Sequence, residues 1–368
     1  MSRSILLIVC TYLCICCVAQ NKQVKGSPVK YYSGDDLLLE GTAIPATEKE
    51  NRYDRLPASY QAKVRSEVWS LSKSSAGLSV HFLSNTTAIK VKWEVLNNFK
   101  MNHMPETGIK GIDLYYKSGD QWQYINTGKP TGKMNEATVV NNMLPEMREY
   151  KIFLPLYDGV VSLDIGIDSL SIFKKPAPAL EKPIVFYGTS ITQGGCASRP
   201  GMAYTNIISR RLNRDCINFG FSGNGRMELS IAELLAETPA SFFVIDCVPN
   251  MNLDQVINNT MPLVEVIRAK QSSTPIVFVE STLFEKSFVD NGLKSEISKK
   301  NAALRVEYEK LKNKGVTNIF YIESKDALGH DHEATVDGVH FTDLGFMRFA
   351  DFLLEKFRQF GLPGSGKQ

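Results

Sequence analysis

Two patterns of apolar residues divide the chain. Between about residues 62 and 168, apolar and polar residues alternate, as where Ile89, Val91, Trp93 and Val95 are separated by Lys90, Lys92 and Glu94. A period of two places every second side chain on one face, which predicts half-buried antiparallel strands. Turn signals such as Asp158-Gly159 separate these runs, and no convincing helix lies among them. The pattern indicates a β-sandwich.

After residue 183, short continuous apolar runs alternate with segments of helical length. Continuous apolar strands are typical of a parallel sheet that helices cover on both faces. The expected strands are 184–187, 216–219, 242–245, 276–279 and 319–322, and the expected helices are 202–212, 227–237, 253–270, 293–314 and 343–360.

The chain has 368 residues, and at about 100–200 residues per domain this length suggests two domains. The segment FKKPAPALEKP separates the two patterns and reads as a stiff, proline-rich linker. We therefore predict an N-terminal all-β, jelly-roll-like sandwich and a C-terminal three-layer α/β/α domain with a central parallel sheet. The predicted ranges are 28–172 for the sandwich, 173–182 for the linker and 183–362 for the α/β/α domain.

The overall charge gives no reason to expect nucleic-acid binding. Lysine and arginine number 42 and aspartate and glutamate 39, so the net charge is +3. Beyond the first twenty residues no apolar run reaches the length of about 18 residues that a membrane span needs. These features leave the oligomeric state open.

The first nineteen residues are predicted to be a secretory signal peptide. Arg3 is the only charge before Lys22, and the apolar stretch between them ends in Cys17-Val18-Ala19, which favours cleavage after Ala19. We therefore expect a secreted or periplasmic protein. A buried helix, a short anchor and a lipoprotein signal at Cys16 or Cys17 are the alternatives.

Few cysteines remain after this cleavage. Four of the seven lie in the predicted leader, and Cys196, Cys216 and Cys247 are left. Three is an odd number, and the spacing is not that of a metal site, so we expect buried free thiols and no disulfide framework.

Polar and glycine-rich segments follow the expected strands. In open α/β sheets the functional loops lie at the carboxyl ends of the strands. Four such segments are Gly188-Thr189-Ser190-Ile191-Thr192, Gly220-Phe221-Ser222-Gly223-Asn224, Asp246-Cys247-Val248-Pro249-Asn250 and, before the last helix, Asp337-Gly338-Val339-His340. Together and in this order they resemble the SGNH/GDSL superfamily of serine esterases, over residues 183–362.

The resemblance implies a catalytic triad and an oxyanion hole. Ser190 would be the nucleophile, His340 the general base, and Asp337 the group that orients the imidazole. The backbone N–H groups of Ser190 and Gly223 and the side-chain amide of Asn250 would stabilise the oxyanion. Such an enzyme forms an acyl-enzyme that water hydrolyses, and it requires no metal or organic cofactor.

The sequence departs from the superfamily pattern at three positions. Thr189 stands where aspartate is commonest, and Val248 and Met251 replace the glycine and aspartate that usually flank Asn250. These changes concern the substrate more than the reaction. Structural alternatives also remain open: Ser190 as a turn serine, His340 as a structural histidine, and Asn250 as the N-cap of the helix that follows.

Several further residues have more than one interpretation. His330 and His332 lie close to His340 in the sequence, so a zinc site is one possibility and a solvated or substrate-facing loop the favoured one. Glu280 ends the fourth apolar run, where we favour a structural role. Trp93 is expected in the core, whereas the polar neighbours of Trp122 make it the better candidate for a surface that stacks on sugars.

We therefore expect a secreted carboxylic ester hydrolase. The leader and the sandwich in front of the hydrolase resemble secreted carbohydrate acetylesterases of Bacteroidetes, which suggests acyl groups, most of all acetyl, on a glycan as the substrate. One alternative is a lipid or aryl ester hydrolase that resembles platelet-activating-factor acetylhydrolases, for which a long apolar cleft beside Ser190 would speak. Another is a non-catalytic glycan-binding protein.

Overall fold

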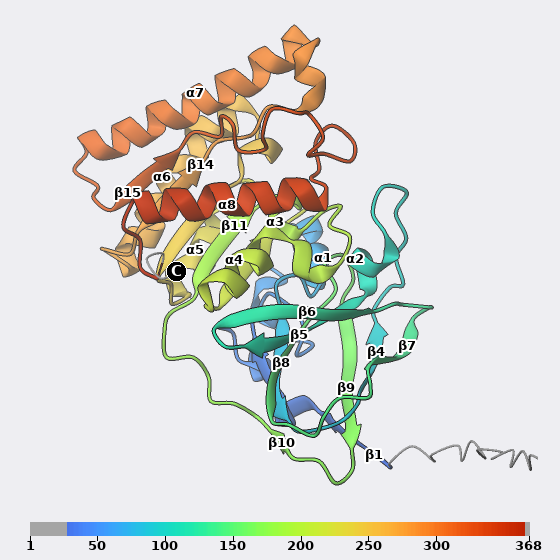
Figure 1. Ribbon diagram of the computed structural model, residues 1–368. Coiled ribbons are helices and arrows are strands. Elements are labelled where there is room, and N and C mark those ends of the chain that lie inside the picture. Colours follow the sequence, from blue (N-terminus) through green and yellow to red (C-terminus); the bar gives the residue numbers. More distant parts are fainter. Residues whose placement is uncertain (1–27, 365–368) are drawn as a thin grey trace, which may run out of the picture.

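A computed structural model describes residues 28–364, so the predicted leader over residues 1–19 lies outside the described part. The chain forms an N-terminal β-rich domain followed by a domain with a five-stranded parallel sheet between helices, and the predicted fold class is thereby confirmed (Figure 1). Within residues 28–364, no helix combines the length and the apolar character that crossing a membrane requires.

The β-domain is a sandwich of two antiparallel sheets. One sheet has the strand order β1-β9-β4-β7, and the other has the order β10-β3-β8-β5-β6 with β2 paired to β3. The strands are β1 (Val29–Ser33), β2 (Leu38–Glu40), β3 (Ser79–Ser84), β4 (Ile89–Val95), β5 (Ile112–Ser118), β6 (Gln121–Gly128), β7 (Met134–Val140), β8 (Arg148–Phe153), β9 (Val160–Asp168) and β10 (Phe173–Lys174). Strand β4 alternates strictly between buried and half-buried residues, and its apolar side faces the core between the sheets.

The second domain contains a parallel sheet in the order β12-β11-β13-β14-β15. Its strands are β11 (Ile184–Gly188), β12 (Cys216–Gly220), β13 (Phe242–Asp246), β14 (Ile276–Val279) and β15 (Ile319–Ile322). All residues of β11 to β14 are buried, as expected for strands that helices cover on both faces.

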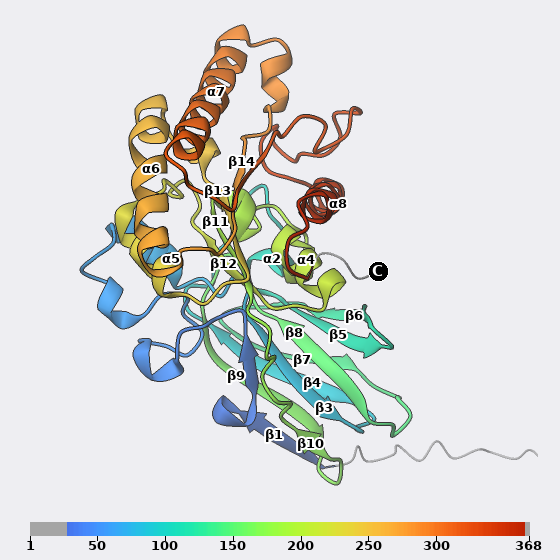
Figure 2. The ribbon, with the colours of Figure 1, turned by 90° about the vertical axis from the view of Figure 1, so that its left-hand side faces the viewer.

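Helices form a layer on each face of this sheet (Figure 2). One core contains α4 (Tyr204–Leu212) and α8 (Asp343–Gln359), and the other contains α5 (Leu229–Glu237), α6 (Leu253–Lys270) and α7 (Asn291–Asn313). Within β11, Ile184 and Phe186 face the first core while Val185 and Tyr187 face the second. The period-two geometry of each strand thus supplies both layers.

The β-domain also contains two short helices that the alternating pattern did not predict, α1 (Ser66–Ser72) and α2 (Glu106–Lys110). Residues around α1 pack on the hydrolase domain, because the apolar side chains of Leu56, Tyr60, Val64 and Val68 belong to the core that holds α5 and α6. The sequence pattern did not predict that these residues would belong to a core of the hydrolase domain, because they precede most of the β-strands in the sequence.

A buried carboxylate joins the two domains at another point. Asp113 on β5 accepts hydrogen bonds from Arg199 Nη1 at 2.8 Å and from the backbone N–H of Gly201 at 2.8 Å. The Asp113 side chain is fully buried. Burial raises the pKa of its carboxyl group, and the charge of the neighbouring Arg199 only partly opposes this rise. Arg199 follows Ser190 by nine positions, so this contact ties the sandwich to the loop after the predicted nucleophile.

Candidate active site

The predicted site residues follow neighbouring strands at one edge of the parallel sheet. From β11, the first strand of the sheet in the sequence, the chain adds β12 on one side and then β13 on the other, and this reversal opens a crevice at the carboxyl ends of the strands. Ser190 follows β11, Gly223 follows β12 and Asn250 follows β13. The topology therefore brings together three residues that are far apart in the sequence.

Ser190 is the first residue of a short helix, α3 (Ser190–Gln193), which the sequence did not predict. Thr189 caps this helix: its hydroxyl accepts a hydrogen bond from Ile191 N, and Thr192 completes the capping box. The next residue after the helix, Gly194, has φ +108°, and its N–H and that of Gly195 donate to the carbonyl of Ser190. Ser190 is thus held on a tight turn from strand to helix.

A chain of hydrogen bonds connects Ser190, His340 and Asp337. Ser190 Oγ lies 2.9 Å from His340 Nε2, and His340 Nδ1 lies 2.8 Å from Asp337 Oδ2. The other carboxylate oxygen of Asp337 accepts from the backbone N–H groups of Val339 and His340, at 3.0 and 2.8 Å. Burial opposes ionisation of Asp337, but the bonds from His340 and from the backbone outweigh it and lower the carboxyl pKa.

The three predicted oxyanion donors belong to the loops that follow β11, β12 and β13. Within the described residues, no acceptor is paired with the backbone N–H of Ser190 or of Gly223. Gly223 has φ +69° with open space where a Cβ would point, so glycine is suited to the backbone conformation there. The amide oxygen of Asn250 accepts from Gly225 N at 3.3 Å, which leaves its NH₂ group to donate.

Asn252, and not Asn250, caps the helix that follows. Asn252 is the N-cap of α6: its side chain accepts from Gln255 N at 2.8 Å, and the Gln255 side chain accepts from Asn252 N at 3.0 Å. Asn250 ends the short 3-10 turn Val248–Asn250 in front of it.

Buried polar side chains hold the loop that carries Ser190 through hydrogen bonds. Gln193 accepts from Ser222 N at 3.0 Å and donates to the carbonyl of Leu156 at 3.0 Å, so it joins this loop to the loop of Gly223 and to the β-domain. The Tyr157 hydroxyl donates to the carbonyl of Ser190 at 3.3 Å. Both side chains were absent from the sequence prediction, because neither belongs to a recognisable motif.

A fully buried carboxylate, Asp246, lies behind Ser190 at the end of β13. It accepts hydrogen bonds from Thr192 Oγ1 at 3.3 Å and from the Tyr204 hydroxyl at 3.1 Å. Burial raises its pKa to about 7, and the two hydrogen bonds only partly oppose this. Asp246 therefore differs from Asp337, whose pKa is lowered.

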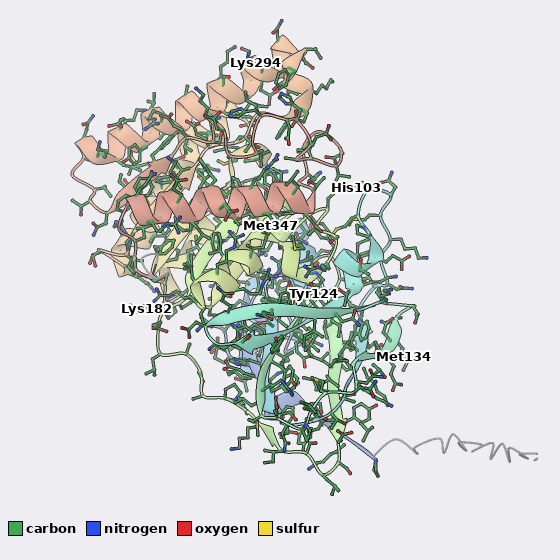
Figure 3. All side chains as sticks on the ribbon, viewed as in Figure 1. His103, Tyr124, Met134, Lys182, Lys294 and Met347 are labelled. Atoms are coloured by element: carbon green, nitrogen blue, oxygen red, sulfur yellow. The ribbon has the colours of Figure 1, made fainter. Side chains whose placement is uncertain are left out.

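The β-domain contributes a loop beside the site, between β4 and α2. His103 lies on this loop next to the hydrolase domain (Figure 3), and its ring centroid is 5.8 Å from that of His340. Met104 on the same loop is buried in the core that also contains Ile191 and Cys196. Cys196 is 5% exposed, and burial together with the charge of Asp337 raises its pKa to about 12, so its thiol is protonated and a poor nucleophile.

A cavity of about 660 Å³ lies between the same loop, α1 and the loop of Gly223. Its apolar wall comes from Leu71, Leu96, Phe99, Met101 and Tyr157, and its polar wall includes Ser66, Ser70, Asn97, Ser222 and Asn224. Two lysines at its edge have acidic partners: Lys73 contacts Glu50 and Asp54, and Lys100 contacts Glu106. The lining of the cavity thus combines apolar and polar side chains, and it includes neither Ser190 nor His340.

The remaining candidates lie away from the site or have structural contacts. His332 Nδ1 is 2.9 Å from Glu285 Oε2, and its ring stands against Phe288, whereas His330 is exposed. These two histidines do not form a cluster of metal-ligating groups with His340. Glu280 accepts from the Tyr321 hydroxyl at 2.7 Å, in keeping with a structural role.

Trp122, the better of the tryptophan candidates for a surface that stacks on sugars, does not form such a surface. Trp122 is buried at the junction of the domains, and its Nε1 donates to Asn213 Oδ1 at 2.9 Å. Trp93 is buried as expected.

Comparison with known proteins shows the family to which the chain belongs. The sequence profile of the GDSL-like lipase/acylhydrolase family matches residues 181–358, and a profile named GxDLY, the N-terminus of SGNH-hydrolase-type esterases, matches residues 29–173. A crystal structure of a protein described as a GDSL-like lipase, from Bacteroides ovatus, is 36% identical, with a TM-score of 0.86 over 90% of this chain and 98% of that one. The chain belongs to the GDSL-like lipase/acylhydrolase family. As a member of this family it is an ester hydrolase.

More distant structures share the fold of this GDSL-like hydrolase. The salicylyl-acyltransferase SsfX3 from a tetracycline biosynthetic pathway is 15% identical, with a TM-score of 0.76 over 92% of this chain and 99% of that one. A family two carbohydrate esterase from Cellvibrio japonicus is 12% identical, with a TM-score of 0.59 over 90% of this chain and 98% of that one. No curated protein sequence matches the chain.

The letters of the N-terminal profile correspond to Gly111-Ile112-Asp113-Leu114-Tyr115 in this GDSL-like hydrolase. Asp113 and the Tyr115 hydroxyl both accept hydrogen bonds from Arg199 Nη1, at 2.8 and 2.5 Å. The motif that gives the β-domain profile its name therefore contacts the loop behind Ser190.

Proposed function

We propose that this GDSL-like hydrolase is an exported serine esterase that removes acyl groups, above all acetyl, from carbohydrate esters. The observation that carries the proposal is the hydrogen-bonded chain from Ser190 Oγ through the His340 imidazole to Asp337, with distances of 2.9 and 2.8 Å. A base within hydrogen-bond reach of a hydroxyl, itself oriented by a carboxylate, is the arrangement that activates a serine.

In this proposal Ser190 Oγ attacks the ester carbonyl while His340 Nε2 takes its proton. His340 then returns the proton to the leaving alcohol, and the acyl group remains on Ser190. Water then adds to the acyl carbon while His340 takes one of its protons, and His340 gives this proton to Ser190 Oγ as the bond between Oγ and the acyl carbon breaks and the acid leaves. Asp337 remains ionised and stabilises the imidazolium in both steps.

The oxyanion of each tetrahedral intermediate needs donors that are already in position. The unpaired backbone N–H groups of Ser190 and Gly223, within the described part of the chain, and the free NH₂ group of Asn250 support this role. These donors come from the ends of three different strands.

The cavity beside the loop of Gly223 combines apolar and aromatic side chains with hydroxyl and amide groups. Such a lining is compatible with a sugar, which presents hydroxyl groups together with apolar ring faces. The fold shared with a carbohydrate esterase agrees with this choice. The apolar leader over residues 1–19 supports export.

The proposal is tested by hydrolysis of para-nitrophenyl acetate and butyrate by the protein without residues 1–19, beside its Ser190→Ala variant. We expect acetate to be the better substrate and the variant to lose at least about 10³-fold in turnover. Ser230→Ala on α5 is the matched control, because it removes a hydroxyl from a helix that packs in the second core, and it should leave turnover unchanged. Acetylated xylan, mannan and pectin then identify the glycan by release of acetate.

Two results would contradict this assignment. Turnover by Ser190→Ala equal to that of the parent would exclude Ser190 as the nucleophile. A clear preference for butyrate and longer chains, without release of acetate from any glycan, would favour a lipid or aryl ester instead.

A further inference from the structure

Among residues 28–364, a cluster of side chains that could hold a metal ion includes the proposed general base itself. His103, Cys196 and His340 each offer one ligand atom, and these atoms all lie within 4.8 Å of one another. They come from three separate segments: the loop before α2, the loop after α3 and the loop before α8. Two imidazoles and a thiol are the ligand types that zinc and related divalent transition metals prefer.

We propose that His103, Cys196 and His340 form a binding site for a divalent transition metal of the zinc type, and that its occupation switches off the esterase. The inhibitory part of this proposal rests on the proposed role of His340 as general base. The binding part rests on the cluster alone.

Outer contacts orient both imidazoles in the way that metal sites require. His340 Nδ1 is bonded to Asp337 Oδ2 at 2.8 Å, and His103 Nδ1 is bonded to Asn102 Oδ1 at 2.9 Å. In each ring this leaves Nε2 as the atom that can coordinate. An oxygen acceptor on the far nitrogen of a ligating histidine is a regular feature of metal sites, because it fixes the tautomer and makes the ligating nitrogen more basic.

The loop that supplies His103 is anchored on both sides of this residue. Upstream, the buried carboxylate of Asp158 accepts from the backbone N–H groups of Asn97 and Phe99, at 2.9 and 3.1 Å. Downstream, Met104 is buried in the interdomain core. The exposed His103 side chain is therefore presented at a defined place by a packed loop.

Cys196 is the buried member of the cluster, on the loop three residues after the end of α3. Its backbone has φ +74°, which is uncommon for a residue with a Cβ. Its thiol lies near His103 and His340, whereas the thiols of Cys216 and Cys247 do not belong to this cluster. A bound metal would displace the thiol proton and hold the sulfur as thiolate.

Inhibition follows from competition for one nitrogen. His340 Nε2 lies 2.9 Å from Ser190 Oγ, and it must accept the serine proton when the ester is attacked. A metal ion on Nε2 occupies the same lone pair, so Ser190 loses its base. With three protein ligands the fourth position of a tetrahedral ion would be open to water or to the Ser190 hydroxyl, which would hold the ion across the site.

The binding test uses Co²⁺ as a spectroscopic probe and Zn²⁺ as its competitor, on protein stripped with a chelator. We expect the parent protein to develop a thiolate-to-cobalt charge-transfer band in the near ultraviolet, and Zn²⁺ to remove it. Cys196→Ala should lose the band, and His103→Ala should bind at least about 10-fold more weakly. His332→Ala and Cys216→Ala are matched controls outside the cluster, and both should bind as the parent does.

The inhibition test measures para-nitrophenyl acetate hydrolysis over a Zn²⁺ titration. We expect the parent to lose turnover and to recover it with chelator, and His103→Ala to need at least about 10-fold more Zn²⁺ for the same loss. His332→Ala should be inhibited like the parent.

Several outcomes would overturn the proposal. The site is wrong if Cys196→Ala and His103→Ala bind cobalt as tightly as the parent, or if no thiolate band forms. The switch is wrong if zinc binds without loss of turnover. If the protein had no esterase activity, the proposed function would fail, whereas the cobalt titration would still decide whether the metal site exists. His103→Ala changes an exposed side chain, so this variant keeps the test valid even if Cys196→Ala fails to fold.

Discussion

The hydrolase domain and the β-domain contribute to the site in different ways. In the hydrolase domain, Ser190, Gly223 and Asn250 follow three parallel strands that end at the same edge. In the β-domain the strands are antiparallel and run alternately in opposite directions, so their ends do not gather at one edge. There the contribution comes from one anchored loop with His103 and from buried contacts such as Asp113 with Arg199. The parallel sheet supplies the proposed reacting groups, whereas the sandwich supplies contacts around them.

The largest effect should come from a group of the hydrolase domain. Asp337→Asn keeps the shape of the side chain but removes the charge that orients and stabilises the His340 imidazolium. We expect kcat on para-nitrophenyl acetate to fall about 10³–10⁴-fold. The double variant with Ser190→Ala should be no slower than Ser190→Ala alone, because the residues act as a unit. A single variant within tenfold of the parent would mean that Asp337 is dispensable.

The next largest effect concerns the proposed oxyanion donor at the third strand end. Asn250→Ala should lower kcat about 10²–10³-fold, because the charge that develops on the carbonyl oxygen loses one donor. Asn252→Ala, two residues along the chain, is a matched control, since Asn252 caps α6. It should lower the free energy of unfolding by about 1 kcal/mol and leave kcat unchanged. Equal kcat values for the two variants would argue against a role for Asn250.

A change in the β-domain should affect stability more than chemistry. Asp113→Asn leaves Arg199 without its buried carboxylate, and we expect the free energy of unfolding to fall by about 2–3 kcal/mol, less than for a fully buried pair because Arg199 is partly exposed. Urea unfolding measures this, with the exposed Asp120→Asn as control. If Asp113→Asn instead had a lower kcat than the parent at urea concentrations well below its unfolding transition, the sandwich would be shown to position the loop that follows Ser190.

The smallest effect is a pH dependence of stability from the second carboxylate near the site. Burial raises the pKa of Asp246 to about 7, so between about pH 4 and this value the folded protein holds a proton that the unfolded chain has released. This stabilisation is complete below the unfolded pKa and is lost as the pH rises through the folded pKa. Between about pH 5 and about pH 8, the parent should lose on the order of 2 kcal/mol more of its unfolding free energy than Asp246→Asn.

Urea unfolding of both proteins at several pH values measures this difference. Asp215, whose pKa burial raises to about 6, remains in both proteins and does not affect the comparison. Parallel pH profiles would show that Asp246 does not retain its proton in the folded state.

The regular elements of the hydrolase domain could be predicted because their pattern is local. Helix α6 spans the predicted residues 253–270, and all five parallel strands lie where the apolar runs are. Helix α3 could not be found in this way. It has only four residues, all buried, so it shows no amphipathic period, and its existence depends on the cap at Thr189.

Contacts between the domains were the part that the sequence concealed. Trp122 has polar neighbours on both sides, yet its hydrogen-bond partner Asn213 is 91 positions away and in the other domain. His103 belongs to no motif, and only the folded chain brings it next to His340. The motif residues Ser190, His340 and Asp337 could be named from the order of four short segments, whereas their roles remain predictions for the variants above to test.

The packing of Leu56, Tyr60, Val64 and Val68 against the hydrolase core also limits how this protein can be divided or rearranged. The ribosome completes these residues before the helices that cover them, so their apolar side chains stay without a partner until the rest of the chain has been made. A gene fragment that begins at the linker would encode a hydrolase with a bare apolar surface, prone to aggregation. In evolution, the two domains are therefore expected to be inherited as a pair. If relatives exchanged their sandwiches, the segment from Leu56 to Val68 would have to stay with the hydrolase domain on which it packs.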